Sequence, residues 1–494
     1  MKQLLLRLLL LDSLMAFVHS HRYFMVVLQE WMPFDKIKEV RMRFDRLKAV
    51  WLFFSICVLY TAWMTGLTFN FSECEIYPNY AMLADGFANG HLFIQAAPTV
   101  DTMLKDGNRY IFPGPVPALV RLPVRLLFGT AIPTGLMIVL FCAGVGTLFA
   151  LILDELVPAD STHRSSLLKK MFILIYIFNG ISLYMVTIPS IYNESICAAM
   201  FFLMLALLFL MKIHNHGYRQ NVGTSIMIGL SLSLSVGCRF SYVYAVTLIF
   251  VVLIFGVWKG SYPSVKWEVL RSLMIIGSIG LASLCLLLMY NFVRFGNILD
   301  FGMAYLESLY QNYFLNGSYF RYDHFPYNMW SLFFRVPQIV AEFPYIQLPA
   351  YILQVRSIGL NPYFLINTNE LTVSVFYLMP ILLLASVPCF SLKSYWDDGL
   401  TKFVVLFSLV AVQIFSVAFT VASIARYYYD FIALLLLLAF MATVQLRSKN
   451  KISNGMIAFL GGISLVLSFA LPMNAITFYA TFIDYQSPLL NIFF

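Results

Sequence analysis

Long apolar runs recur along almost the whole chain, and they constrain the fold more than any other feature. A membrane-spanning helix needs about 20 mostly apolar residues, and about eleven stretches approach or meet this length. The composition agrees, because 61% of the 494 residues are hydrophobic and only 11% are charged, whereas about a quarter are charged in a soluble protein. The sequence therefore predicts an all-α polytopic membrane protein. The predicted spans are roughly 50–68, 132–153, 170–188, 195–212, 222–238, 241–258, 272–292, 372–390, 403–424, 431–446 and 455–472.

The basic residues predict how the chain is oriented in the membrane. Cytoplasmic loops carry an excess of Lys and Arg. With the N-terminus in the cytoplasm, 22 of the 32 Lys and Arg fall in short cytoplasmic segments, and nine of the other ten are arginines. We therefore interpret the net charge of +8 as loop charge of a membrane protein and not as a nucleic-acid-binding surface.

This orientation divides the chain into three parts. A basic, amphipathic N-terminal segment covers 1–49, the transmembrane domain covers 50–472, and the tail 473–494 ends outside the cytoplasm. Residues 4–18 also look like the apolar core of a signal peptide, but Arg7 and Asp12 interrupt them and no small-x-small cleavage pattern follows. A helix lying on the cytoplasmic membrane face is favoured over a cleaved signal or an extra span.

The long loops are expected on the outer side, at about 69–131 and 293–371. Proline-spaced aromatic segments in the second loop predict helices lying along the membrane surface, although interfacial aromatic belts alone explain such density. The P-loop, a GxGxxG turn after a strand and HExxH are missing from the sequence, so an ATP-driven pump or a nucleotide-sugar transferase is not expected. Function is expected to face outward, towards the periplasm of a bacterium or the lumen of a eukaryotic endoplasmic reticulum.

Metal and disulfide chemistry have little support in the sequence. The seven cysteines include no CxxC pair, so neither a zinc site nor a disulfide framework is suggested. His91 or His324 could ligate a divalent metal together with a carboxylate, but no spacing supports such a site.

Acidic residues gather in the first long loop. Five of the 24 Asp and Glu lie between positions 73 and 106. A carboxylate just beyond a span, where polarity falls, has a raised proton affinity and can serve as a general base. The alternative is a solvated loop whose acids face water. The five acids are Glu73, Glu75, Asp85, Asp101 and Asp106.

Charged residues also occur between closely spaced apolar runs. Glu194 lies in a very short hairpin, so we expect it near membrane depth, either in a functional role or as a partner of Arg239 or Arg426. These two arginines also sit at tight junctions, where they could snorkel to lipid phosphates or clamp a lipid-linked phosphate with two hydrogen bonds each. Arg294 follows the seventh span.

Taken together, these features resemble the membrane-embedded GT-C glycosyltransferases, the superfamily of protein O-mannosyltransferases and lipid A aminoarabinose transferases, and more narrowly the bacterial family 39-like proteins. The resemblance covers about 50–440, and the order of its loose motifs is more specific than any one of them. The residues that carry it are Glu73 and Glu75, Tyr80 to Gly90, Gly107-Asn108-Arg109-Tyr110 to Pro113-Gly114-Pro115, Tyr192-Asn193-Glu194, Asn291 to Gly302, and Arg426-Tyr427 to Asp430-Phe431.

The resemblance implies a GT-C fold, an isoprenoid-phosphate sugar donor and an inverting transfer on the outer membrane face. In the family, an Asp or Glu of the first outer loop is the base, and Glu75 is the best match, then Glu73, with Asp85 a further candidate. The chemistry requires no metal. We expect the substrate and its phosphate to be bound by Arg239, Arg426, Arg294, Arg109, Glu194, Tyr427, Asp101 and Asn291.

The sequence leaves two other functions open. A transporter or flippase for lipid-linked glycans predicts polar residues in the middle of spans, whereas the charges here gather at span ends. An O-antigen ligase or polymerase, which uses pyrophosphate-linked glycans, predicts a catalytic histidine in a large outer loop, and His324 lies in such a loop.

Overall fold

The computed structural model describes most of the chain from residue 34 onward. The described residues are 34–482 and 489, with gaps at 75–77, 96–101, 157–162, 217–221, 259–265, 308–310, 312–314, 316, 318–319, 342, 349–372, 391–397, 421–423 and 449. The chain divides into two compact units, Met1–Ser55 and Ile56–Phe494.

The described part of the first unit is the beginning of helix α2 (Phe34–Met64). The basic cluster and the first predicted span form one continuous helix, because no Gly or Pro interrupts the sequence between Pro33 and Gly66. Residue 49, where the sequence placed the end of the N-terminal segment, therefore lies inside α2. The apolar part, Leu47–Met64, is long enough to cross a membrane.

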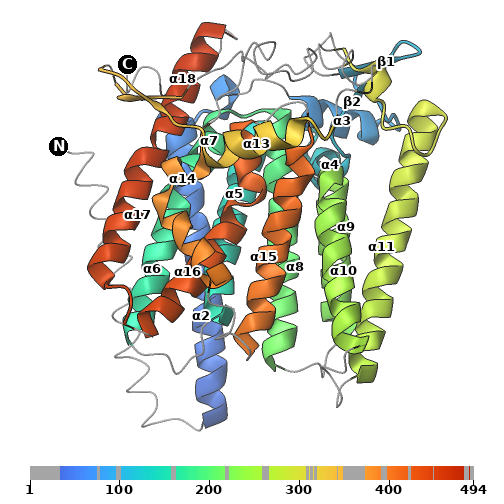
Figure 1. The fold of residues 1–494 in the computed structure, drawn as a ribbon. Coiled ribbons are helices and arrows are strands. Elements are labelled where there is room, and N and C mark those ends of the chain that lie inside the picture. The colour runs from blue at the N-terminus through green and yellow to red at the C-terminus, as the bar shows by residue number, and fades with distance from the viewer. Residues whose placement is uncertain are drawn as a thin grey trace. The chain divides into compact units, whose positions relative to one another are not determined.

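The second unit is built mainly from long helices that run alongside one another (Figure 1). Pairs that pack together include α5 with α8, α8 with α9, and α9 with α11. The helices are α5 (Thr134–Leu156), α6 (His163–Phe178), α7 (Gly180–Thr187), α8 (Ile191–His216), α9 (Val222–Cys238), α10 (Val243–Trp258), α11 (Lys266–Phe295), α15 (Asp398–Ala418), α16 (Ile432–Ser448), α17 (Asn454–Ser468) and α18 (Ala470–Phe482).

Six helical stretches in the described residues are long and apolar enough to span a membrane. The protein is thus an integral, multi-pass membrane protein, while the total of eleven spans and the GT-C fold stay predictions. The six stretches are Leu47–Met64, Thr134–Leu156, Ser166–Thr187, Ile191–Ile213, Trp267–Phe295 and Asn454–Thr477, and shorter apolar helices cover Val222–Cys238, Phe240–Phe255, Leu406–Ala418 and Ile432–Arg447.

The segment 372–390, predicted to be one membrane-spanning helix, has a different secondary structure. Its described part forms the short helix α14 (Val375–Leu378) and the 3-10 helix η5 (Pro380–Phe390) instead of one α-helix. Pro380 and Pro388 explain the difference, because proline lacks the amide hydrogen that a continuous α-helix needs. The start of the predicted tail is also helical, since α18 continues to Phe482.

Two spans are interrupted at points that touch each other. The predicted span 170–188 divides at Asn179 into α6 and α7, and α17 gives way to α18 at Phe469. The amide of Gly180 donates to the hydroxyl of Ser468 (2.9 Å), and Asn179 caps α7 by accepting from the amide of Ser182 (2.9 Å). The tyrosine hydroxyl of Tyr60 donates to the carbonyl of Ile177 (2.9 Å), so side chains satisfy the freed backbone groups.

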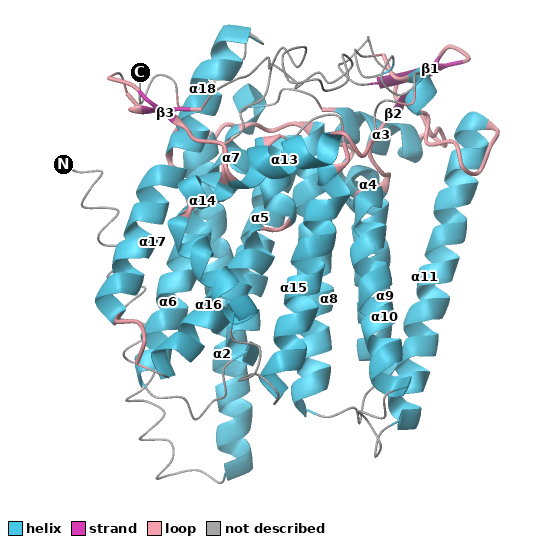
Figure 2. Ribbon diagram, viewed as in Figure 1, coloured by secondary structure: helices cyan, strands magenta, loops and turns pink. Residues whose placement is uncertain are grey.

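Short elements gather at one end of the helices of the second unit, which we call the loop end (Figures 1 and 2). The strands are confined to it in Figure 2. The loop end contains η1 (Phe71–Cys74), α3 (Asn79–Ala88), β1 (Thr102–Lys105), β2 (Asn108–Ile111), α4 (Val116–Phe128), η2 (Phe240–Tyr242), η3 (Met303–Tyr305), α13 (His324–Phe333), β3 (Gln338–Ile339), β4 (Ile346–Gln347) and η7 (Ala425–Asp430).

The strands make the fold mostly helical rather than all-α. β1 and β2 pair antiparallel, with Thr102 opposite Ile111 and Lys105 opposite Asn108. Asp106 and Gly107 form the connecting turn with φ of 51° and 80°. An Asp-Gly pair with two positive φ angles is typical of a two-residue hairpin loop.

Candidate functional site

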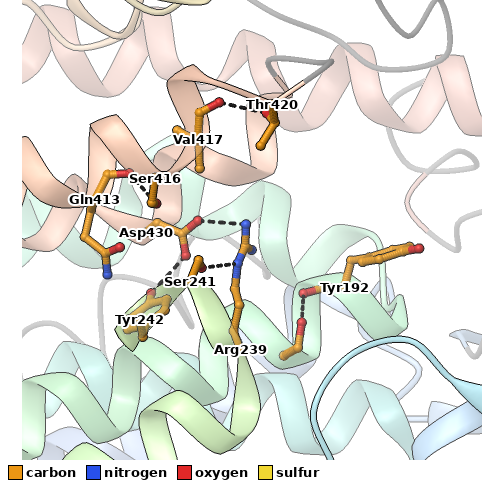
Figure 3. A network of polar contacts seen from close by, with 10 residues as sticks. Tyr192, Arg239, Ser241, Tyr242, Gln413, Ser416, Val417, Thr420 and Asp430 are labelled. Atoms are coloured by element: carbon orange, nitrogen blue, oxygen red, sulfur yellow. Dashed lines mark hydrogen bonds and ion pairs between the residues drawn. The ribbon is translucent and has the colours of Figure 1, made fainter. Parts of the chain in front are cut away.

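An ion pair between distant segments lies at the loop end. α9 ends at Cys238, and extended backbone at Arg239 (φ −150°) separates it from η2. This interruption lets the Arg239 guanidinium reach Asp430, the last residue of η7, with 3.2 Å between Nη2 and Oδ2 (Figure 3). Nε of Arg239 donates to the hydroxyl of Ser241 (3.1 Å), and Tyr242 donates to Oδ1 of Asp430 (2.9 Å).

Asp430 is buried, with 1% of its side chain exposed. Burial raises the pKa of this carboxyl group, while Arg239 and the hydrogen bond from Tyr242 act in the opposite direction. Arg239 is less enclosed, at 18% exposure, and its guanidinium lies over the ring of Tyr427 at 4.9 Å. Asp430 therefore orients an arginine that keeps donor groups available.

Arg426 lies in the same 3-10 helix as Asp430 and is also buried. Its guanidinium is 4.4 Å from the ring centre of Tyr192, a residue of the first turn of α8. The structure thus brings Arg239, Arg426 and Tyr427 together, three residues that the sequence predicted to bind substrate.

Arg294 is a buried cation of a different kind. It lies at the end of α11, with 7% exposure, and it donates to the carbonyl of Ile111 (3.3 Å) and to Oδ1 of Asn291 (2.7 Å). Its guanidinium stacks on the ring of Tyr290 at 3.9 Å. Among the described residues no carboxylate lies within ion-pair distance of Arg294, and its Nε has no hydrogen-bond partner.

Glu194 lies in the first turn of α8 and is fully buried. Its carboxylate forms a two-pronged ion pair with Arg121 of α4, in which Nη2 donates to Oε2 at 2.8 Å and Nη1 donates to Oε1. Nε of Arg121 also donates to the carbonyl of Ile132 (2.8 Å). As the alternative to a functional role, the sequence predicted that Glu194 pairs with Arg239 or Arg426, whereas its partner in the structure is Arg121.

The loop that precedes α4 packs tightly on the end of α9. A Cβ at Gly114 would lie 1.9 Å from the carbonyl oxygen of Gly237, so only glycine fits there. This contact joins the Pro113-Gly114-Pro115 segment to the residues just before Arg239.

Other predicted residues lie nearer the surface. Asp85 pairs with Arg125, and the two side chains are 48% and 27% exposed. Arg109 pairs with Glu307 at 3.3 Å, and Glu307 also accepts from the hydroxyl of Thr102 (2.8 Å). The second pair holds the β1–β2 hairpin against the segment that follows α11.

Asp85 is the predicted base whose side chain the structure describes. Glu75 and Asp101 lie outside the described residues, as does the side chain of Glu73, whose backbone belongs to η1. Asp85 is described, but its carboxylate is engaged by Arg125.

The histidines considered as metal ligands have other neighbours. His91 stacks on Phe93, with 4.9 Å between ring centres. Nδ1 of His324 donates to the carbonyl of Phe419 (3.2 Å), just beyond the end of α15, and burial lowers the pKa of this histidine. Within the described ranges, no three His, Cys, Asp or Glu residues are arranged to hold a metal ion.

Sequence reasoning missed three residues of the site: Arg121, Tyr242 and Asp430. Asp430 was noticed as part of a motif, but its signal as a site residue was only its position beside Arg426 at a tight junction. Arg121 and Tyr242 carried no signal, because their partners are 73 and 188 positions away.

Comparison with known proteins assigns no relative. No protein-family model matches the chain, and no curated protein matches it either.

Proposed function

We propose that this protein is a membrane glycosyltransferase of the GT-C type. It moves one sugar from a polyprenyl-phosphate donor to a lipid-linked or cell-envelope glycan acceptor, with inversion, at the loop end of the second unit. In a bacterium the loop end would face the periplasm, across the inner membrane. No nucleic acid partner or resident cofactor is part of this proposal.

The observation that carries the proposal is the burial of Arg294 without a carboxylate in contact among the described residues. Burying a guanidinium without a carboxylate is costly, because the charge loses its hydration and gains no counter-charge. Arg294 is buried in this way at the end of α11, with Nε unpartnered among the described residues. Asp300 acts on this guanidinium only from beyond ion-pair distance. A bound phosphate would supply a negative charge in direct contact, and guanidinium groups bind phosphate with two parallel hydrogen bonds.

The proposed reaction is a single displacement. A loop carboxylate, Glu75 or Glu73, removes the proton of an acceptor hydroxyl, whose oxygen attacks the anomeric carbon of the donor sugar. The bond from that carbon to the phosphate oxygen breaks, and the polyprenyl phosphate leaves with the bonding electrons. Arg294 and Arg239 would stabilise the negative charge that develops on the leaving phosphate.

Transport is the second candidate, because two interrupted spans meet at Gly180 and Ser468. Interrupted spans often bind substrate in transporters through their exposed helix ends. Here the ends are occupied by Asn179, Ser468 and Tyr60, so the interruption needs no ligand.

A donor assay tests the proposal. The full-length protein in nanodiscs is offered short-chain polyprenyl phosphates carrying different sugars, with cell-envelope lipid as acceptor, and released polyprenyl phosphate is measured by mass spectrometry. We expect release from one donor, and a loss of at least about tenfold in Arg294→Gln, the size of one charge-assisted hydrogen bond.

Arg321→Gln is the matched control. Arg321 is a partly exposed arginine at the loop end that pairs locally with Asp323 (2.8 Å), so its removal is expected to leave release unchanged. Absence of release from every monophosphate donor, with folded protein, would reject the proposal and favour pyrophosphate-linked donors. Equal losses in Arg294→Gln and Arg321→Gln would reject the role of Arg294.

A further inference from the structure

Two buried tyrosine hydroxyl groups at the loop end, those of Tyr80 and Tyr290, have no hydrogen-bond partner among the described residues. Tyr80 belongs to α3 and is 1% exposed, and Tyr290 belongs to α11, one turn before Arg294. Neither hydroxyl donates to or accepts from a described group. Most buried polar groups in native proteins are hydrogen-bonded, so this pair calls for an explanation.

Ile111, the last residue of β2, links the two tyrosines and Arg294. The ring of Tyr80 packs in a buried cluster with Ile111, Ala118 and Ile191. Arg294 donates to the carbonyl of that same Ile111, and the Tyr290 ring lies against its guanidinium. The first long loop, α3 and the end of α11 therefore contribute to one place.

The electrostatic surroundings support this proximity. Burial is the main cause that raises the pKa of Tyr80 well above its ordinary value, and Glu194, Cys238 and Tyr290 add to the rise, while Arg121 opposes it. Tyr80 is thus a neutral phenol that can both donate and accept a hydrogen bond. The guanidinium of Arg121 lies 5.9 Å from its ring centre.

The chemistry of these groups indicates what they recognise. Phenol hydroxyls match the hydroxyls of a neutral sugar, which also donate and accept. An ammonium group would require a carboxylate, but the carboxylate of Glu194 is engaged by Arg121. Arg121 and Glu194 neutralise each other, whereas the guanidinium of Arg294, which has no carboxylate at ion-pair distance among the described residues, lies against the ring of Tyr290 and would repel a second cation.

We propose that Tyr80 and Tyr290 form the subsite for the sugar of the donor, beside the phosphate that Arg294 binds, and that this subsite selects a neutral sugar over one that carries an ammonium group. The inference rests on the proposed function, because the sugar is joined to the phosphate that Arg294 binds.

Binding measurements test the subsite without requiring turnover. The full-length protein in nanodiscs is titrated with a 20-carbon polyprenyl phosphate, with the same lipid carrying mannose, glucose or galactose, and with the lipid carrying 4-amino-4-deoxyarabinose. We expect one neutral glycosyl lipid to bind more tightly than the bare phosphate, and the amino sugar to bind no more tightly than the bare phosphate.

Removal of single hydroxyl groups then identifies the residues. Tyr80→Phe and Tyr290→Phe are each expected to weaken binding of the neutral glycosyl lipid about three- to tenfold, the range for one hydrogen bond, and to leave binding of the bare phosphate unchanged. Their thermal midpoints should not fall, because neither hydroxyl has a partner to lose.

Tyr176→Phe is the matched control. Tyr176 is also buried, but its hydroxyl donates to that of Tyr429 (3.1 Å). Its loss is expected to lower the thermal midpoint and to leave sugar binding unchanged.

Each other outcome has a defined meaning. If neither the bare nor the glycosylated lipids bind, the proposed function fails, and the subsite fails with it. If all lipids bind alike and the two Phe variants change nothing, the phosphate site stands and the sugar subsite is wrong. Tighter binding of the amino sugar than of every neutral sugar would overturn the charge argument.

Discussion

At the residue scale, the buried pair of Arg121 and Glu194 is expected to govern stability. Both side chains have no exposed surface, and they bond through two contacts. Glu194→Gln removes the counter-charge and leaves a buried guanidinium, which is expected to destabilise the fold by about 3–5 kcal/mol. The measurement is the thermal midpoint in detergent. The double variant Arg121→Met/Glu194→Leu should recover much of the loss, because no charge is left unpaired.

The control is the partly exposed pair of Asp85 and Arg125. Asp85→Asn is expected to cost less than about 1 kcal/mol, because water solvates the remaining charge. A Glu194→Gln variant as stable as the parent chain would contradict the assignment of the buried pair as a stabilising contact.

The sequence identified many charged residues of the loop end but not their pairing. Glu194, Arg239 and Arg426 were singled out because charges at membrane depth are costly, and Arg294 because it follows the seventh span. Their partners were less predictable, because an ion pair depends on where separate helices pack. Asp430 lies 191 positions after Arg239 in the chain, and no local pattern joins them.

At the element scale, the contact between the two interrupted spans depends on a glycine. A Cβ at Gly180 would lie 1.6 Å from the carbonyl oxygen of Ser468. This is a steric overlap with the backbone, so backbone atoms must move to relieve it. Gly180→Ala is therefore expected to separate α7 from α17 and α18 and to lower the thermal midpoint by several degrees.

Gly462→Ala in α17 is the control for this prediction. A Cβ there meets no atom within 4 Å, and alanine favours helix over glycine, so the midpoint should be unchanged or higher. Equal midpoints for the Gly180→Ala and Gly462→Ala variants would show that the two spans do not pack closely at Gly180.

Element boundaries were predictable where the local sequence decides them. The helix over Val222–Cys238 agrees with the predicted span, because polar or charged residues flank an apolar run. The Asp106-Gly107 turn was a readable hairpin signal that the all-α prediction passed over. The division at Asn179 was less readable, because the contact between the neighbouring Gly180 and Ser468 spans 288 positions of the chain.

At the scale of the whole molecule, the distribution of arginine and lysine is consistent with the predicted membrane orientation. Arg121, Arg294 and Arg426 are buried at the loop end and Arg239 is partly buried there, whereas lysines outnumber arginines in the segments predicted to be cytoplasmic. Lysine suits the solvated loops that the positive-inside rule describes, and arginine suits buried pairs with carboxylates or phosphates. Burial therefore explains in part why ten basic residues are predicted on the outer side, where the positive-inside rule expects few.

The orientation itself is testable by labelling of introduced cysteines. Tyr322 is 86% exposed at the loop end, just before α13. Lys451 is exposed after α16, a helix that begins beside η7 and rises about 25 Å, so it lies at the opposite end. In intact cells, a membrane-impermeant maleimide is expected to label Tyr322→Cys but not Lys451→Cys, which should react only after permeabilisation. The parent chain with its native cysteines gives the background. The reverse pattern would place the loop end in the cytoplasm, where a polyprenyl-phosphate sugar presented on the outer face could not reach Arg294.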